Sequence, residues 1–211
     1  MENRMIRIPS SKGSVTLKAV PGHFATNHSH TNYYMDMTTL KARQSEASAI
    51  AAELAAACAS RYVVDTVLCL DGTEVVGAYL AEELCRSGIS ILNQHGTIYV
   101  VRPEYSAGQM IVRDNILPMI RGKNVLLLSA TISSGISCRK SMESVEYYGG
   151  HVSAVTSIFS TLEECGGLPV HAIFTPANLP GYQSFAPHQC PLCQSKQPLD
   201  ALVNAYGYSK L

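Results

Sequence analysis

The chain has 211 residues, of which 46% are hydrophobic and 15% charged, so it is typical of a globular domain rather than a disordered protein. Sixteen basic and sixteen acidic residues cancel to zero net charge, which argues against nucleic acid as a partner, because nucleic-acid binding needs a basic surface. No apolar run approaches the roughly 20 residues that span a bilayer. With no signal-like N-terminus either, we expect a cytoplasmic protein without a membrane partner.

Helices and strands alternate through the middle of the chain. The alanine-rich segment 44–60 predicts a helix, and the β-branched run 63–70 predicts a buried strand before Asp71-Gly72. Further helices are expected at 75–88, where Gly88 would end the helix, and from about Ser137 to Gly149. A short helix or turn, interrupted by Pro118, is expected at 113–122. The other expected strands are ISIL (89–92), TIYVV (97–101), VLLLS (125–129), HVSAVTSIF (151–159) and VHAIFT (170–175).

This alternation predicts one α/β domain over residues 1–211, with a doubly wound, mainly parallel sheet flanked by helices. Residues 1–40 and about 176–211 lie outside the pattern, and we expect them to form a small cap over the ligand edge of the sheet. Ligands of such sheets bind beyond the carboxyl ends of the strands. Two loops lie at such ends, 71–77 and 129–137.

The loop from Ser129 to Ser137 has the composition of an anion site. It runs from a strand through small and hydroxyl residues to a helix N-terminus, where free N–H groups and the helix dipole favour a phosphate. Gly135 permits a tight turn or close approach of a phosphate oxygen. The alternative is an ordinary connection in which Ser137 is the N-cap of the helix. Taken alone, the loop does not separate the two interpretations.

The same stretch resembles the ribose-phosphate motif of the type I phosphoribosyltransferases. That motif is an apolar strand, two acids and a hydroxyl-rich turn around a glycine. The turn is present here, whereas Ser129 and Ala130 stand in place of the acids. The resemblance implies that the turn binds the 5′-phosphate of phosphoribosyl pyrophosphate (PRPP). The implied phosphate-binding residues are Ser133, Ser134, Gly135, Ile136 and Ser137.

Four more segments follow in the order found in orotate phosphoribosyltransferases. They are GHFATNHSHTNYYMDM (22–37), GTEVVGAYLA (72–81), VVRP (100–103) and CPLCQSKQPL (190–199). The second resembles the family's pyrophosphate loop. The segment EYSAGQMIVRD stands where the family's catalytic loop is expected, and it contains neither the lysine nor the histidine of that loop. The resemblance implies Gly72, Thr73 and Glu74 in the pyrophosphate loop, and Arg102 as a further ligand contact. It also raises Tyr33 and Tyr34 as ligand contacts, although packing in the core or cap is the favoured interpretation of these two residues.

By this resemblance the chain is a phosphoribosyltransferase-family protein that transfers or binds the 5-phosphoribosyl group of PRPP in pyrimidine nucleotide metabolism. Mg²⁺ is the implied cofactor, a phosphorylated sugar or nucleotide the implied ligand, and a homodimer the implied assembly. Losing one preorganised electrostatic group commonly costs on the order of 100- to 1000-fold in rate. Whether the chain is an enzyme therefore stays open. The alternatives are a catalytically degenerate regulator that binds a nucleotide or sugar phosphate, and a structural protein without the site.

Other acids could replace the missing pair. Glu74 is the preferred candidate near Mg²⁺, because it lies in the segment that resembles the pyrophosphate loop. Asp71 is interpreted as a turn residue before Gly72, and Asp114 is a third candidate on the shortened catalytic loop.

Seven cysteines without a secretory signal are expected to be reduced. Cys190 and Cys193 form a single CxxC, whereas structural zinc takes four ligands. His188, Cys165 or His171 could complete such a set, but we favour reduced cysteines packed in the tail. His23, His28 and His30 are interpreted as part of a histidine-rich loop in the cap.

Overall fold

The computed structural model describes residues 2–86, 93 and 96–211. A mainly parallel sheet lies at the centre of the molecule. Its strand order is β10-β11-β9-β8-β4-β5, and only the pairing of β10 with β11 is antiparallel. The strands are β4 (Thr66–Cys69), β5 (Tyr99–Val101), β8 (Asn124–Ile132), β9 (His151–Ser160), β10 (Glu164–Cys165) and β11 (Leu168–Phe174). The prediction of a doubly wound, mainly parallel sheet is confirmed.

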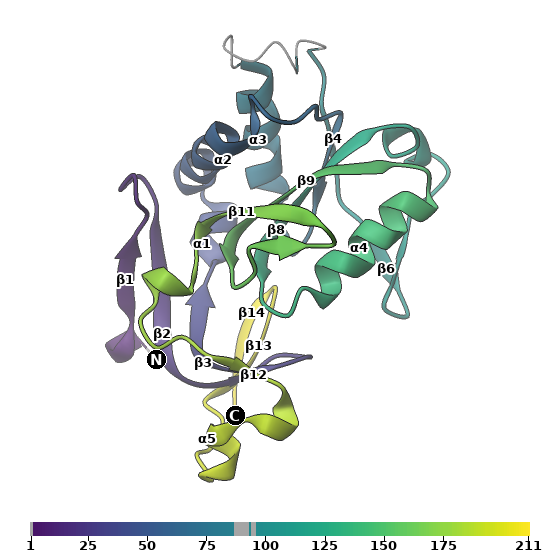
Figure 1. Cartoon of the computed structure of the whole chain (residues 1–211). Helices are drawn as coiled ribbons and strands as arrows, with labels where there is room; N and C mark the ends of the chain where they lie inside the picture. The colour runs from purple at the N-terminus through teal and green to yellow at the C-terminus, as the bar shows by residue number, and fades with distance from the viewer. Residues whose placement is uncertain (1, 87–92, 94–95) are drawn as a thin grey trace.

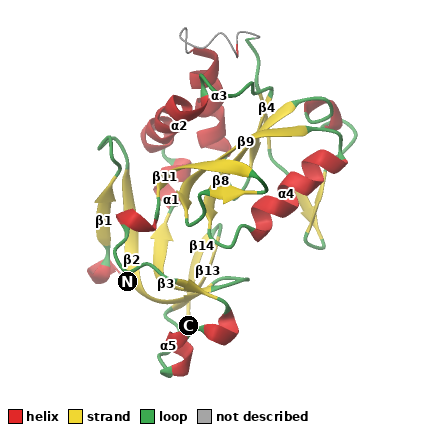
Figure 2. Ribbon diagram, viewed as in Figure 1, coloured by secondary structure: helices red, strands yellow, loops and turns green. Residues whose placement is uncertain are grey.

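Helices cover both faces of this sheet, as Figures 1 and 2 show. One face packs against α1 (Thr38–Ala42), α2 (Gln44–Cys58) and α3 (Glu74–Arg86), and the other against α4 (Ile136–Tyr147). Alternation along β4 explains the two cores: Val67 and Cys69 belong to the first cluster, Leu68 to the second. The central strands β4 and β8 are mostly apolar, because both of their faces are buried.

Both ends of the chain build a second sheet, which lies beneath the first in Figure 1. Its strands are β1 (Ile6–Pro9), β2 (Thr16–Ala25), β3 (His30–Asp36), β12 (Ser184–Phe185), β13 (Ala201–Asn204) and β14 (Gly207–Lys210). β13 pairs in parallel with β2, with Ala201 opposite Phe24. The Asp200 carboxylate accepts hydrogen bonds from Arg4 at 2.6 Å and from the backbone N–H of His23 at 2.9 Å. These contacts join the two ends of the chain, and we call this sheet the cap.

Local details differ from the sequence-based expectations. The segment 104–111, expected as a loop, is a hairpin of β6 (Glu104–Ser106) and β7 (Gln109–Ile111). Its turn residues Ala107 and Gly108 have φ of 49° and 77°, the left-handed pair that a two-residue hairpin requires. Within 113–122 the regular element is the 3₁₀ turn Leu117–Met119, and the predicted strand 89–92 and helix end at Gly88 lie outside the described residues.

The remaining short elements are α5 (Pro191–Gln194) and the 3₁₀ turns Glu2–Arg4, Pro176–Asn178 and Pro187–Gln189. Among the helices that the structure describes, none is long and apolar enough to cross a membrane.

Candidate functional site

The site lies at the point where the central sheet reverses its winding. β4 connects through α3 to β5 on one side, and its neighbour β8 connects through α4 to β9 on the other. Ligands of open α/β sheets bind at such a switch point, outside the carboxyl ends of the two strands. The two loops that follow these strands meet there, because the Ser129 hydroxyl donates a hydrogen bond to the Asp71 carboxylate.

A cavity of about 630 Å³ lies between these loops and the cap. Five parts of the chain line it. The end of β8 and the start of α4 contribute 129–138, and the β4 loop contributes Asp71 and Gly72. Residues from 26 to 42 and the turn 203–207 supply the cap side, together with Tyr182. Residues from both ends of the chain therefore line this cavity opposite the strand ends of the central sheet.

The turn 133–137 presents an uncapped helix end to this cavity. α4 begins at Ile136 with Gly135 at the N-cap, and no side chain caps its free N–H groups. Ser137 is thus the second residue of the helix, and the expectation that it is the N-cap is wrong. Ser134 and Ser137 are exposed, as a phosphate cradle requires. All five predicted phosphate-binding residues line the cavity.

Neighbouring side chains hold the backbone of this turn in place. Gly135 has φ of 72°, and a Cβ there would lie 2.7 Å from Leu162 Cδ1. The Thr161 hydroxyl donates to the Ser133 carbonyl at 2.5 Å, and Arg139 donates to the Ser134 carbonyl at 3.0 Å. These contacts engage carbonyl groups of the turn, and its N–H groups have no side-chain cap.

The residues of the predicted pyrophosphate loop have different roles. Gly72 lines the cavity, and it follows Asp71 in a pair of left-handed residues with φ of 59° and 74°. Thr73 is fully buried, and its hydroxyl donates to the carbonyls of Leu70 at 2.7 Å and Leu128 at 3.2 Å, so its role is structural.

Glu74 and Arg102 are paired with each other and are not among the lining residues. Glu74 is the first residue of α3, and its Oε1 lies 3.3 Å from Arg102 Nε. The lining carboxylate is Asp71, which is also in a turn before Gly72, as the sequence predicted. Asp114 is exposed and also lies away from the cavity.

Lys41 is a site residue that the sequence patterns did not reveal. Its ammonium group donates to the carbonyls of Asp71 at 2.7 Å and Ala205 at 2.5 Å, joining the β4 loop to the cap. Burial lowers the pKa of Lys41, while the negative charges of Asp71 and Glu74 oppose this shift. Among the described lining residues it is the one lysine or arginine. It lies outside every motif in the sequence, so no local signal marked it.

Aromatic side chains form another part of the wall. Tyr33 and Tyr34, both predicted as ligand contacts, line the cavity together with Tyr182. Tyr34 packs between Phe24 and Tyr208, with ring centroids 5.9 Å and 5.3 Å away, and burial raises its pKa to about 12. Tyr33 and Tyr182 lie 6.4 Å apart between ring centroids. This wall offers apolar surface and π-faces to a planar ligand group.

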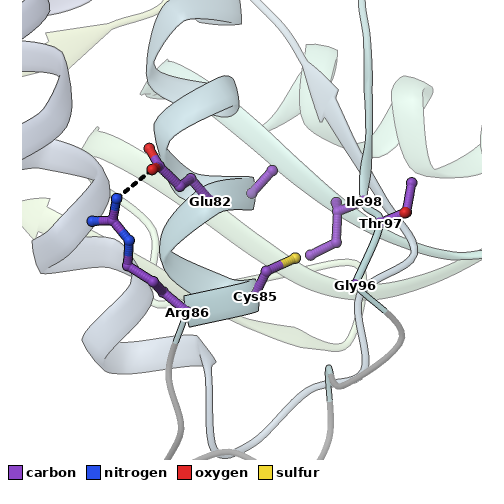
Figure 3. A pocket seen from close by; sticks show the side chains of 7 residues that line it. Glu82, Cys85, Arg86, Gly96, Thr97 and Ile98 are labelled. Atoms are coloured by element: carbon purple, nitrogen blue, oxygen red, sulfur yellow. Dashed lines mark hydrogen bonds and ion pairs between the residues drawn. The ribbon is translucent and has the colours of Figure 1, made fainter.

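A second hollow of about 500 Å³ lies at the end of α3, shown in Figure 3. Glu82 and Arg86 form an ion pair with each other on α3, and Cys85 points toward Ile98. Among the described residues that line this hollow, no set of polar groups converges. The larger cavity is therefore the candidate site.

Comparison with known proteins finds similarity at the level of the fold. No family model matches the chain, and no curated protein matches it. Among solved structures it is similar to Mycobacterium tuberculosis orotate phosphoribosyltransferase in complex with PRPP, with a TM-score of 0.50, 18% identity and coverage of 69% of this chain and 82% of that chain. The chain is also similar to the orotate phosphoribosyltransferase of Aeropyrum pernix, with a TM-score of 0.50 and 17% identity. This match covers 84% of this chain and 90% of that chain.

Leishmania donovani UMP synthase gives a TM-score of 0.55 at 13% identity, over 76% of this chain and 34% of that larger protein. The similarity to these three proteins is one of overall fold and extends over 69–84% of this chain. The chain has the type I phosphoribosyltransferase fold.

Proposed function

We propose that this protein binds the 5-phosphoribosyl group of PRPP or of a nucleotide in the cavity between the central sheet and the cap, as a phosphoribosyltransferase-type protein of nucleotide metabolism. The uncapped N-terminus of α4 carries the proposal, because its free N–H groups open onto a cavity at the switch point. The M. tuberculosis protein of similar fold is described in complex with PRPP.

Different groups of lining residues face different parts of the proposed ligand. The turn 133–137 receives the 5′-phosphate, and Ser129 with Asp71 faces the ribose hydroxyls. Gly72 and the Lys41 ammonium supply the N–H and the positive charge for a second anionic group. Tyr33, Tyr34 and Tyr182 provide the apolar wall for a base.

Mg²⁺ would be held by the Asp71 carboxylate and by the phosphate oxygens of the ligand. Mg²⁺ sites commonly use one or two carboxylates plus substrate phosphates, so this donor set fits. Bound there, the ion would neutralise charge on a pyrophosphate group. The side chain of Asp71 replaces Glu74 as the preferred candidate, since Glu74 is paired with Arg102 outside the lining.

A second candidate function is binding without transfer. Ala130 stands where the second acid of the motif would be, and Asp71 is the one carboxylate among the described lining residues. The hairpin 104–111, in the position of the catalytic loop, contributes no residue to the described lining. These observations favour a regulator that senses a nucleotide or sugar phosphate, should turnover be absent.

Calorimetric titration with PRPP, ribose 5-phosphate and orotidine 5′-monophosphate, each with and without Mg²⁺, tests the proposal. Saturable binding of at least one of them is expected. Ser134→Asp should weaken it at least about 10-fold, because a carboxylate would repel the phosphate in the cradle. Ser11→Asp, at an exposed serine in the turn between β1 and β2 and outside the lining, is the matched control and should bind normally.

Pyrophosphate release from PRPP with orotate and other bases then separates the two candidates. Turnover that needs Mg²⁺ identifies a transferase, and binding without turnover identifies a sensor. A folded protein that binds none of the three phosphates contradicts the proposal.

A further inference from the structure

Two histidines and two cysteines from distant parts of the chain converge at the base of the cap. His23 lies on β2 and His30 on β3, on either side of the loop that joins these strands. Cys190 and Cys193 come from the start and middle of the α5 segment. One ligand atom from each of the four residues lies within 4.8 Å of the other three. We propose that His23, His30, Cys190 and Cys193 bind one zinc ion.

The distances fit a tetrahedral ion. His23 Nε2 lies 3.2 Å from His30 Nδ1, and Cys193 Sγ lies 3.2 Å from His30 Nδ1. His23 Nε2 lies 3.5 Å from Cys190 Sγ and 3.6 Å from Cys193 Sγ. Zinc bonds of about 2.3 Å to sulfur and about 2.0 Å to nitrogen place two nitrogens about 3.3 Å apart, and a nitrogen and a sulfur about 3.5 Å apart. Four of the six distances among the ligand atoms thus lie close to the edges of a zinc tetrahedron, and the other two are below 4.8 Å.

The surroundings orient His23 as a ligand. Its Nδ1 lies 2.9 Å from the carbonyl of Gln197, so Nδ1 carries the proton and Nε2 is left free for a metal. The ring is almost fully buried, and the Asp200 carboxylate holds its backbone N–H. A ligand histidine normally donates its other ring N–H to a carbonyl or carboxylate in this way.

The donor set points to zinc rather than to Mg²⁺ or Ca²⁺, because two thiolates and two imidazoles suit zinc, whereas those ions take oxygen ligands. Both thiols lose their protons on binding. Our interpretation of the cysteines as simply packed in the tail missed the partners. His188 is exposed, Cys165 lies near the Gly135 carbonyl, and His171 is hydrogen bonded to Tyr62, so none of these three belongs to the set.

The site would tie the C-terminal segment to the β2–β3 hairpin. The loop between the two histidines contributes Thr26, Asn27 and His28 to the wall of the ligand cavity. Zinc therefore holds in place a part of the cap that the ligand meets. The four ligands themselves lie outside the described cavity lining, so the ion is structural.

Metal analysis of tag-free protein, purified with a thiol reductant and dialysed, tests this inference. We expect about one zinc per chain. Cys193→Ser should lose it, whereas Cys85→Ser and His188→Ala, at an exposed cysteine and an exposed histidine outside the set, should retain it. Cys193 is exposed, so its substitution leaves the core intact.

Cobalt titration of the metal-depleted wild-type chain gives a second readout that needs no variant. Saturation at one equivalent, with intense visible bands and thiolate-to-cobalt charge transfer, is expected for a tetrahedral site with two thiolates. Binding of neither metal by the reduced protein, or undiminished zinc in Cys193→Ser, would overturn the proposal.

Discussion

Lys41 carries the positive charge of the candidate site. The Lys41 ammonium group faces the Asp71-Gly72 loop, so replacement by glutamine would remove the charge-assisted ligand contact that we propose there. Such contacts are worth about 1.5–3 kcal/mol, so Lys41→Gln should weaken PRPP binding about 10- to 100-fold in calorimetry. Lys140→Gln, at an exposed lysine of α4 outside the lining, should leave affinity unchanged. Equal affinities of the two variants would contradict this role.

Gly135 is needed for its backbone and for its missing side chain. Gly135→Ala adds the cost of a left-handed residue, about 1–2 kcal/mol, and drives a methyl group toward Leu162. Both effects displace the phosphate cradle, so ligand affinity and the free energy of unfolding should fall together.

Gly108→Ala isolates the backbone cost. Gly108 also has positive φ, but a methyl group added there would meet no atom within 4 Å, and the residue is in the hairpin outside the described lining. Urea unfolding should show a comparable backbone cost, with unchanged ligand affinity. Loss of affinity in Gly108→Ala as well would mean that Gly135 has no special part in the cradle.

At the scale of elements, α3 approaches β4 closely because Gly77 has no side chain. A methyl group there would collide with Cys69 Sγ and would contact Val100 Cγ1 at 3.3 Å. Overpacking of this kind typically costs about 1–3 kcal/mol, so Gly77→Ala should lower the urea midpoint by a corresponding amount. The double variant Cys69→Ala/Gly77→Ala should lose less than the sum of the single losses, since removal of the sulfur relieves the collision. Strict additivity would show that the two residues do not compete for this space.

At the scale of the whole molecule, the cap depends on contacts between the two ends of the chain. If one zinc joins β2, β3 and the tail, its removal by a chelator releases the tail from the hairpin. A metal present at about 100 times its dissociation constant stabilises a folded protein by about 2.7 kcal/mol. For a chain of this size, that corresponds to roughly 5–10 °C in the melting temperature. Calorimetric scanning should show this decrease in the wild type and no further decrease in Cys193→Ser. An identical melting temperature with and without chelator would argue against a structural metal.

The homodimer implied by the family resemblance also belongs to this scale, and it stays a prediction that light scattering of the purified protein can check.

Much of the central fold was readable from local patterns. Runs such as VLLLSATI are apolar at nearly every position, because a parallel sheet is buried on both sides, and the loop after this run carries its own glycine and serines. The hydroxyl-rich turn and Gly72 were found for the same reason: the residues that form each loop are consecutive. The start of α4 shifted by one residue, from Ser137 to Ile136, because Gly135 rather than a serine occupies the N-cap.

What the sequence by itself determined is therefore the alternation of strands and helices, and with it the edge of the sheet where the candidate site lies. The tertiary structure alone decided which residues meet across that edge. Lys41 reaches Asp71 and Ala205, Asp71 rather than Glu74 lines the cavity, and His23 meets Cys190. Periodicity is a property of neighbours in the chain, whereas these contacts join residues that are far apart in the sequence, as does the pairing of β2 with β13.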